Sequence, residues 1–286
     1  MSFDDAYGAL TDHDDDARWA YGTGFADPLA GVSSEVPAGV DRAGLAAYAL
    51  MLGDDALVLS HRLQQWITRA PELEDELALA NIALDLLGQA RLLLTRAGEV
   101  EGAGRDEDAL AYGRGADAYR NVRFVEAVAG DFAQLCARLL VFSSWRLALF
   151  ARLADASDPV LAAIAVKGVK EVTYHREYAA GWVVRLGDGT PLSHDRMQAA
   201  VDGLWPYLGE LFVGHAVEAA AGVDPALLRD EVDGVLAQVL DAATLSRPAA
   251  AAPPADTGRD GAHTPALAEL LAELQSVARD HPDGVW

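Results

Sequence analysis

The sequence predicts an all-α fold built around four long helices. From Leu45 onward the chain consists mainly of long apolar segments with helical spacing. Signals for strands are nearly absent, because apolar and polar residues do not alternate over any sustained stretch and no hairpin-type turn joins two apolar runs. The four long helices form two hairpins separated by one long connection, which is the outline of a ferritin-like four-helix bundle.

The first hairpin is predicted from helices over residues 42–69 and 71–96. Pro71 ends the first helix at Ala70, because a proline restricts the conformation of the residue before it. The same proline suits the first turn of the second helix, which we expect to end at Gly98. Four acidic residues lie at the positive end of that helix's dipole: Glu72, Glu74, Asp75 and Glu76.

The connection between the hairpins, residues 98–120, is polar and rich in glycine. It is long for a structureless connection, so we expect it to cover a surface of the bundle or of a partner. The third helix is predicted over residues 126–154. Asp158 as N-cap and Pro159 as first helical residue then start the fourth helix, which reaches about Leu186.

The sequence predicts one ferritin-like helical domain over residues 41–286, in which a fifth helix covers about 193–220 and a sixth follows it. Residues 245–263, rich in Ala and Pro, are predicted to be an extended linker, and residues 264–280 a terminal helix. Residues 1–40 are rich in Asp and Gly with little periodicity, which predicts a disordered acidic arm.

The charge of the chain limits its possible partners. The 286 residues carry a net charge of −22, from 44 acidic and 22 basic side chains, which argues against nucleic acid and anionic membranes as partners. Lysine occurs only at Lys167 and Lys170, a bias that fits a salty cytoplasm or a GC-rich genome equally well. The single cysteine, Cys136, excludes a disulfide framework within the chain, and the N-terminus does not resemble a signal peptide. We therefore expect a cytoplasmic protein. No charge-free apolar run reaches the ~18 residues of a membrane span.

A polar stripe in the second helix raises the possibility of a metal site. Bundles of this kind often hold two metal ions on one Glu or Asp from each of two helices and a Glu-x-x-His from each of the other two. The apolar segment "LANIALDLLGQARLLL", residues 79–94, carries Asn81, Asp85 and Gln89 on one face. We expect Asp85 to be a buried carboxylate in a ligand position. The histidine place three residues later is Gly88, which offers no ligand.

The first and fourth helices supply the other candidate ligands. Glu171 has Tyr174 three residues later, and His175 stands one residue too far, although residues four apart still share a helix face. The first helix offers Asp54 or Asp55, about 30 residues before Asp85. Across the hairpin, either of them is at a position that plausibly matches Asp85.

The third helix has no carboxylate within residues 135–145, "LCARLLVFSSW", and carries Arg138 instead. A cation there would oppose a metal cluster, and it is expected to neutralise Asp85 or Glu171. The sequence therefore favours a metal-free core in which buried acids and bases pair with one another. A dimetal centre with unusual ligands and a mononuclear site remain the alternatives.

Five segments, in this order, resemble a known family. They are "YALMLGDDALVLSHRLQQW", "APELEDELALANIALDLLGQAR", "DPVLAAIAVKGVKEVTYHREYAAGWVVRLGDGT", "LWPYLGELF" and "GRDGAHTPALAELLAELQ…HPDGVW". The similarity, to the C subunits (PaaC type) of phenylacetyl-CoA epoxidases, spans residues 42–286, whereas residues 1–40 match nothing known to us.

The resemblance implies a ferritin-like fold and a structural, non-catalytic role in phenylacetate degradation. In that family a catalytic, ferritin-like A subunit holds the di-iron centre and inserts one atom of O2 into the aromatic ring of phenylacetyl-CoA. Further subunits include a flavin and iron–sulfur reductase fed by NADPH. For this chain the resemblance implies no cofactor of its own, iron in the partner A subunit, and assembly into a hetero-oligomer.

Two other functions stay open from the residues alone. One is a free-standing di-iron or di-manganese carboxylate oxidase that uses Asp54, Asp85, Glu171 and His175. The other is a ferritin-like storage or scaffold protein without an oxygenase partner. For the structural role, we expect the contacts with the partner to come from four segments: "SSWRLALF" (143–150), "LWPYLGELF" (204–212), the connection 98–120 and the tethered helix 265–280.

Overall fold

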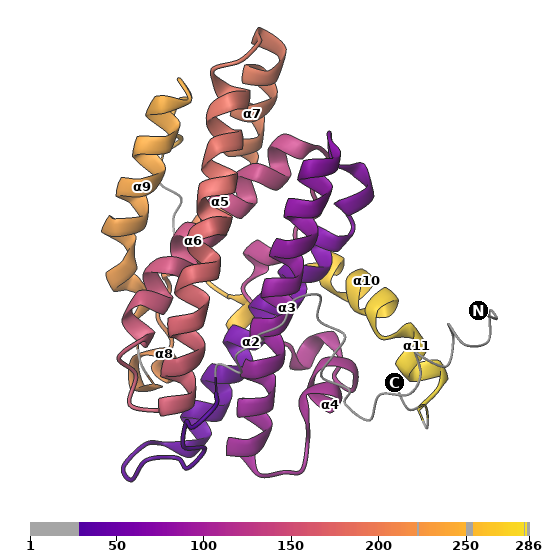
Figure 1. Cartoon of the computed structure of the whole chain (residues 1–286), viewed down its shortest axis with the longest axis vertical. Coiled ribbons are helices and arrows are strands. Elements are labelled where there is room, and N and C mark those ends of the chain that lie inside the picture. Colours follow the sequence, from indigo (N-terminus) through magenta and orange to yellow (C-terminus); the bar gives the residue numbers. More distant parts are fainter. Residues whose placement is uncertain (1–28, 222, 250–253, 283, 285–286) are drawn as a thin grey trace, which may run out of the picture. The chain divides into compact units, whose positions relative to one another are not determined.

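The first helical hairpin consists of α2 (Arg42–Gln64) and α3 (Leu73–Glu101) (Figure 1). The short 3-10 turn η2 (Ile67–Arg69) lies between these two helices. The computed structural model describes residues 29–221, 223–249, 254–282 and 284. The chain divides into two units, residues 1–31 and 32–286, and everything below concerns the second. Most of the predicted acidic arm therefore lies outside the described residues.

Sequence features explain how α2 and α3 begin, end and pack. The side chain of Asp41 caps α2 by accepting a hydrogen bond from the backbone N–H of Ala43 at 3.1 Å. α3 ends at Gly102, whose φ of 71° is a conformation that suits glycine. The Ser60 hydroxyl, near the end of α2, donates to the backbone oxygen of Ala83 at 2.7 Å and so joins the two helices.

The second hairpin consists of α5 (Phe132–Leu153) and α6 (Pro159–Gly187). Asp158 caps α6 as the sequence predicts, and its carboxylate also forms a buried ion pair with Arg96 of α3. That ion pair links the two hairpins. The predicted start of α5 at residue 126 is wrong, because Asp131 caps the helix by accepting from the N–H of Gln134 at 2.9 Å. The residues before it form the separate 3-10 turn η4 (Arg123–Val125).

Short helices fill the connection between the hairpins and the region after α6. Between the hairpins the chain forms α4 (Glu107–Tyr112), η3 (Ala116–Ala118) and η4, so short helical segments make up much of it. The later elements are α7 (Pro191–Leu204), η5 (Trp205–Phe212), α8 (Ala216–Ala221), η6 (Pro225–Leu228), α9 (Arg229–Ala242), η7 (Gly258–Asp260), α10 (Pro265–Leu274) and α11 (Ser276–Asp280). The described residues contain no strand, and the all-α prediction is confirmed.

Two of the later predicted helices are interrupted. The single helix expected over 193–220 stops at Leu204, where the 3-10 segment η5 takes over at Trp205 and Pro206. The terminal helix expected over 264–280 is divided at Gln275. The amide of Gln275 is buried and donates to the backbone oxygens of Ala111 and Arg114, at 2.9 and 3.0 Å, so the tail is held on the connection between the hairpins.

Three helical segments among the described residues are long and apolar enough to cross a membrane by length and composition: 42–69, 73–101 and 132–153. Within this chain, 83% of the apolar window of the first and 89% of that of the third are buried, against 50% for the second, α3. The bundle interior therefore accounts for the apolar character of α2 and α5 but for only half of that of α3.

Candidate functional site

The eight positions singled out in the sequence do not come together in one place. Asp54 and Asp55 lie on α2 and contact the connection and the C-terminal segment. Asp85 and His175 meet between α3 and α6, one helical turn from the pair formed by Glu171 and Gln89. Arg138 and Gly88 contribute to neither group, and the exposed Tyr174 contacts the second only through its ring, which lies edge-on to that of His175.

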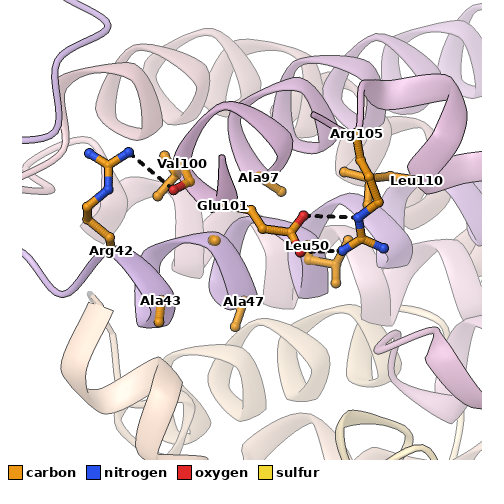
Figure 2. Close-up of a pocket in the computed structure, with 10 residues that line it drawn as sticks. Arg42, Ala43, Ala47, Leu50, Ala97, Val100, Glu101, Arg105 and Leu110 are labelled. Atoms are coloured by element: carbon orange, nitrogen blue, oxygen red, sulfur yellow. Dashed lines mark hydrogen bonds and ion pairs between the residues drawn. The ribbon is translucent and has the colours of Figure 1, made fainter. Parts of the chain in front are cut away.

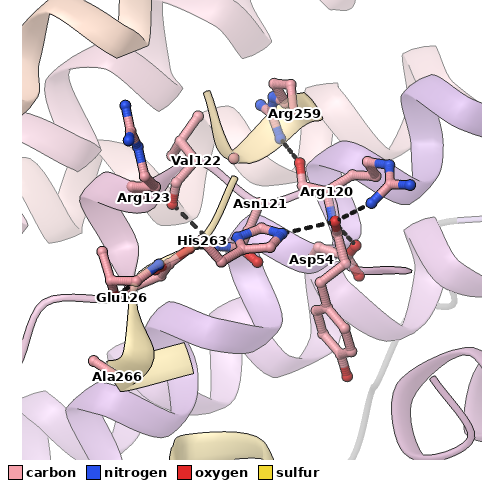
Figure 3. Close-up of polar contacts among 12 residues, drawn as sticks. Asp54, Arg120, Asn121, Val122, Arg123, Glu126, Arg259, His263 and Ala266 are labelled. Atoms are coloured by element: carbon pink, nitrogen blue, oxygen red, sulfur yellow. Dashed lines mark hydrogen bonds and ion pairs between the residues drawn. The ribbon is translucent and has the colours of Figure 1, made fainter. Parts of the chain in front are cut away.

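Asp54 is fully buried and both of its oxygens are occupied. The guanidinium of Arg114, on the connection, binds them in a bidentate ion pair, and Nη1 lies 2.9 Å from Oδ2. The backbone N–H of Arg120 donates to the same Oδ2 at 2.8 Å (Figure 3). Although burial lowers the pKa of Arg114, the Asp54 carboxylate beside it raises that pKa above its ordinary value. Asp54 therefore anchors the connection to α2.

Asp55 plays the same part for the C-terminal segment. Arg259 approaches it through Nη1 at 3.0 Å from Oδ1 and Nη2 at 2.8 Å from Oδ2, and both residues are buried. The backbone N–H of Val122 donates to Oδ1 at 2.9 Å. Arg146 of α5, which is completely buried, lies 3.8 Å from Oδ2. Two arginines thus surround this carboxylate. Their positive charges neutralise it and would repel a metal cation, so Asp55 is poorly suited to be a metal ligand.

Asp85 is only half-buried, so the expectation of a buried carboxylate is wrong. Its side chain is 36% exposed and its Oδ2 lies 3.0 Å from Nε2 of His175, whose own side chain is 1% exposed. Asp85 thus lies at the edge of the core-facing side of α3, and its pair with His175 joins α3 to α6. Glu171 accepts a hydrogen bond from Gln89 Nε2 at 3.0 Å and pairs with Lys167 on its own helix.

Arg138 does not neutralise Asp85 or Glu171, contrary to the expectation from sequence. Among the residues that the structure describes, its Nε and Nη1 have no hydrogen-bond partner, although the residue is only 3% exposed. Burial lowers the pKa of Arg138 to about 10, and the nearby Arg62 contributes to the lowering. The guanidinium is still charged at neutral pH, so α5, which contains no carboxylate, contributes a buried cation.

A second polar cluster, the Glu126 cluster, joins the connection to the start of the C-terminal helices (Figure 3). Glu126 is fully buried and accepts from His263 Nδ1 at 2.6 Å, from Asn121 Nδ2 at 3.0 Å and from the backbone N–H of Thr264 at 2.7 Å. His263 Nε2 lies 2.9 Å from the backbone oxygen of Tyr119. Both ring nitrogens of His263 thus face acceptors, an arrangement that only the protonated imidazole satisfies.

The described residues therefore do not fit a metal centre. They contain no group of three or more His, Cys, Asp or Glu side chains placed to share an ion. Each candidate carboxylate is already engaged by an arginine, a lysine, an amide or a histidine. A dimetal site needs four carboxylates and two histidines around one point, whereas Asp54 and Asp55 are bound by arginines and lie apart from the Asp85–His175 pair.

Comparison with known proteins gives the chain a family. The family model PaaA_PaaC, described as phenylacetic acid catabolic protein, matches residues 32–286. The chain belongs to this family. It is 44% identical over 247 residues to the protein named as the C subunit of 1,2-phenylacetyl-CoA epoxidase in Escherichia coli (strain K12), and the match covers 85% of this chain and 99% of that protein. The family match begins close to the boundary between the two units at residue 31.

For this family member, the residues that sequence reasoning missed are the partners of the acids. Arg114 lies in the connection, Asn121 and Glu126 lie between the connection and α5, and Arg259 and His263 lie in the segment expected to be an extended linker. The signal was present as charged residues within short stretches, "RNVRFVEA" and "GRDGAHTP". Their pairing with α2 depends on contacts that are distant in sequence.

A surface groove also separates the ends of α2 and α3 (Figure 2). It has a volume of about 440 Å³ and a floor of small apolar side chains that includes Ala43, Ala47 and Ala97. Its charged groups are satisfied locally: Arg42 donates to the backbone oxygen of Val100 at 3.2 Å, and Arg105 pairs with Glu101 (Figure 2). The groove therefore presents no free reactive group.

Proposed function

We propose that this chain is a structural, non-catalytic subunit of a cytoplasmic, multicomponent di-iron oxygenase that epoxidises the aromatic ring of phenylacetyl-CoA in phenylacetate degradation. The catalytic, ferritin-like A subunit holds the iron, and further subunits, including a reductase, supply electrons. The chain itself holds no cofactor and assembles with the A subunit. The family membership and the relative named as an epoxidase C subunit support the assignment to this oxygenase.

The observation that carries the non-catalytic role is the occupation of Asp54 and Asp55 by arginines. Both acids are completely buried, and Arg114 and Arg259 bind them in bidentate ion pairs. A metal ion could take either carboxylate only by leaving a buried guanidinium without its partner. Breaking a buried pair in this way costs about 3–5 kcal/mol. These residues are therefore better suited to hold the bundle together than to release their oxygens to iron.

The alternative of a free-standing di-iron or di-manganese oxidase loses support for the same reason. It requires Asp54 to join Asp85, Glu171 and His175, but Asp54 is engaged by the connection while the other three lie in the seam between α3 and α6. A storage or scaffold protein without an oxygenase partner agrees equally well with the ion pairs. Only the family membership argues against it.

Metal analysis with and without the catalytic subunit tests the proposal. The chain should be purified alone and after co-expression with the A subunit of the same oxygenase, and its iron content measured. We expect iron only in the co-purified complex. We expect NADPH- and O2-dependent epoxidation of phenylacetyl-CoA only when the A subunit and the reductase are both present. About two irons per chain in the isolated protein, as a dimetal site requires, would overturn the non-catalytic role.

A further inference from the structure

Arg138 differs from most of the buried arginines in having no carboxylate partner. In the part of the chain that the structure describes, the buried arginines are Arg62, Arg96, Arg114, Arg138, Arg146 and Arg259. Four of them pair with a buried aspartate: Arg96 with Asp158, Arg114 with Asp54, and both Arg146 and Arg259 with Asp55. Within the same described residues, Arg138 has no carboxylate beside it, and its Nε and Nη1 have no hydrogen-bond partner.

Arg138 lies inside the bundle, on a helix that is largely enclosed. Only 3% of the residue is exposed, and 89% of the apolar window of α5 is buried. The segment 143–150 of the same helix is enclosed as well, because Trp145, Leu149 and Phe150 are buried. The expectation that these side chains contact a partner is therefore wrong. A carboxylate of another protein is equally unable to reach Arg138 while the bundle is closed.

The charged group that acts on Arg138 is a second arginine, Arg62 of α2. Burial and Arg62 both lower the pKa of Arg138, and among the described residues no carboxylate raises it. The guanidinium of Arg62 is itself held by neutral acceptors. Its Nε and Nη2 donate to the backbone oxygens of Glu126 and Ala266 at 2.9 and 2.7 Å, and its Nη1 donates to Gln65 Oε1 at 3.1 Å. Two like charges therefore lie near each other between α2 and α5.

The carboxylates around Arg62 do not compensate Arg138. Glu126, Glu269 and Glu273 raise the pKa of Arg62 but do not act on that of Arg138. The carboxylate of Glu126 is already bound within the Glu126 cluster. Glu269 and Glu273 are exposed on α10, where water screens their charge. The positive charge of Arg138 is thus left without a counter-charge from these residues.

A buried cation of this kind requires an anion rather than water alone. Taking a charge out of water is costly unless an opposite charge accompanies it. Water can accept hydrogen bonds from the guanidinium, but it brings no negative charge. Loss of the proton does not solve the problem either, because the pKa of Arg138, about 10, keeps the group charged at neutral pH. A small anion supplies both the acceptor and the charge.

We propose that Arg138, with Arg62 beside it, binds one small inorganic anion of the halide class, chloride, between α2 and α5. The anion accepts hydrogen bonds from N–H groups of Arg138 for which the described residues supply no acceptor. It also offsets the repulsion between the two guanidinium groups. Because the unfolded chain does not bring Arg138 and Arg62 together, the anion binds only the folded chain and stabilises it.

Urea unfolding of the full-length chain in potassium chloride and in potassium gluconate tests this site. At equal potassium concentration the two salts screen surface charges alike, and gluconate is far larger than a halide. At a chloride concentration 100 times its dissociation constant, the equilibrium constant for folding should be about 100-fold higher than in gluconate. The urea midpoint should therefore be higher in chloride.

Substitutions of Arg138 separate this site from a general effect of salt. Arg138→Met should abolish the difference between the two salts, and Arg138→Lys, which keeps the charge, should retain part of it. The matched control is Arg196→Met, because Arg196 is exposed on α7, and it should keep the full difference. If chloride shifts the midpoints of the unaltered chain and Arg138→Met equally, the proposal is overturned.

Diffraction in bromide tests the site without any substitution, so it decides the matter even if Arg138→Met does not fold. Crystals of the unaltered chain grown in bromide should show an anomalous peak within hydrogen-bonding distance of the Arg138 guanidinium. Water at that place, or bromide only at exposed arginines, would overturn the proposal. Neither experiment uses the A subunit, so its failure leaves the proposed function untouched.

Discussion

Arg259 Nη2 lies 2.8 Å from Asp55 Oδ2 in the interior of the protein, although the two residues are 204 positions apart in the chain. The pair places the C-terminal segment against α2, where Arg259 also donates to the backbone oxygens of Met51 and Arg120 at 3.0 and 2.7 Å. The tail is therefore part of the bundle and holds the first helix and the connection in place.

Removing this arginine should destabilise the whole chain. In Arg259→Met, the buried carboxylate of Asp55 loses its bidentate partner, so we expect the free energy of unfolding to fall by about 3–5 kcal/mol. Arg196→Met is the matched control, because Arg196 is exposed on α7 and its loss should cost less than about 0.5 kcal/mol. Urea unfolding followed by circular dichroism measures both. Equal midpoints for the two variants would contradict the anchoring role.

The acids of α2 should matter more for stability than the acid of α3. We expect Asp54→Asn to cost about 3–5 kcal/mol, because it leaves Arg114 buried without its charge partner. Asp85→Asn should cost about 1 kcal/mol or less, since the Asp85 side chain is 36% exposed. Chemical unfolding of the isolated chain compares them directly. If Asp85→Asn proved the more damaging of the two, Asp85 would be a core residue after all.

The Glu126 cluster predicts a dependence of stability on pH. Burial lowers the pKa of His263, but the Glu126 carboxylate and the backbone oxygen of Tyr119 outweigh burial and the charge of Arg120, so the pKa of His263 is raised. A histidine with a raised pKa contributes its stabilisation fully below its unfolded pKa of about 6.5 and loses it as the pH rises through the folded value. The contribution of His263 should therefore decline on the alkaline side of about pH 6.5.

His263→Gln isolates this contribution, because glutamine donates to Glu126 without carrying a charge. The difference in free energy of unfolding between the unaltered chain and the variant should be largest near about pH 6 and should shrink toward about pH 9. Denaturant unfolding at several pH values gives this difference directly. A difference that grows with pH would show that His263 does not hold the Glu126 cluster together as a cation.

Two glycines should respond to alanine in opposite directions. Gly88, in a histidine place of the dimetal pattern, has no atom within 4 Å of the position that a Cβ would take, so Gly88→Ala should stabilise α3 by about 0.5–1 kcal/mol. At Gly258 the new Cβ would lie 2.0 Å from the backbone oxygen of Asn121, so Gly258→Ala should displace the tail. Thermal unfolding of both variants tests the pair. Destabilisation by Gly88→Ala would mean that this position is enclosed.

The sequence by itself determined the helical class and most of the framework. The apolar periodicity located the four long helices and the Asp158-Pro159 cap placed the start of α6, because these signals act within a few residues and are independent of the rest of the chain. The bounds predicted for α3 were wrong: Pro71 lies before the helix, which begins at Leu73, and the helix continues past Gly98 to Glu101. The missing histidine at Gly88 and the cation at Arg138 predict a metal-free core, a prediction that metal analysis of the isolated chain tests. The start of α5 was predicted too early, at residue 126. The apolar pattern of the helix continues before Asp131, and the N-cap signal of Asp131 was not recognised as the start.

Only the tertiary structure decided which partner each buried charge has and how deeply Asp85 is buried. The pattern of α3 is apolar almost all the way round, and such a pattern does not say which side meets the core and which is left exposed. Arg114 and Arg259 reach Asp54 and Asp55 from positions 60 and 204 residues away. A buried charge is costly without a partner, but which pairs form is set by how the connection and the tail pack against α2, and no local pattern encodes that.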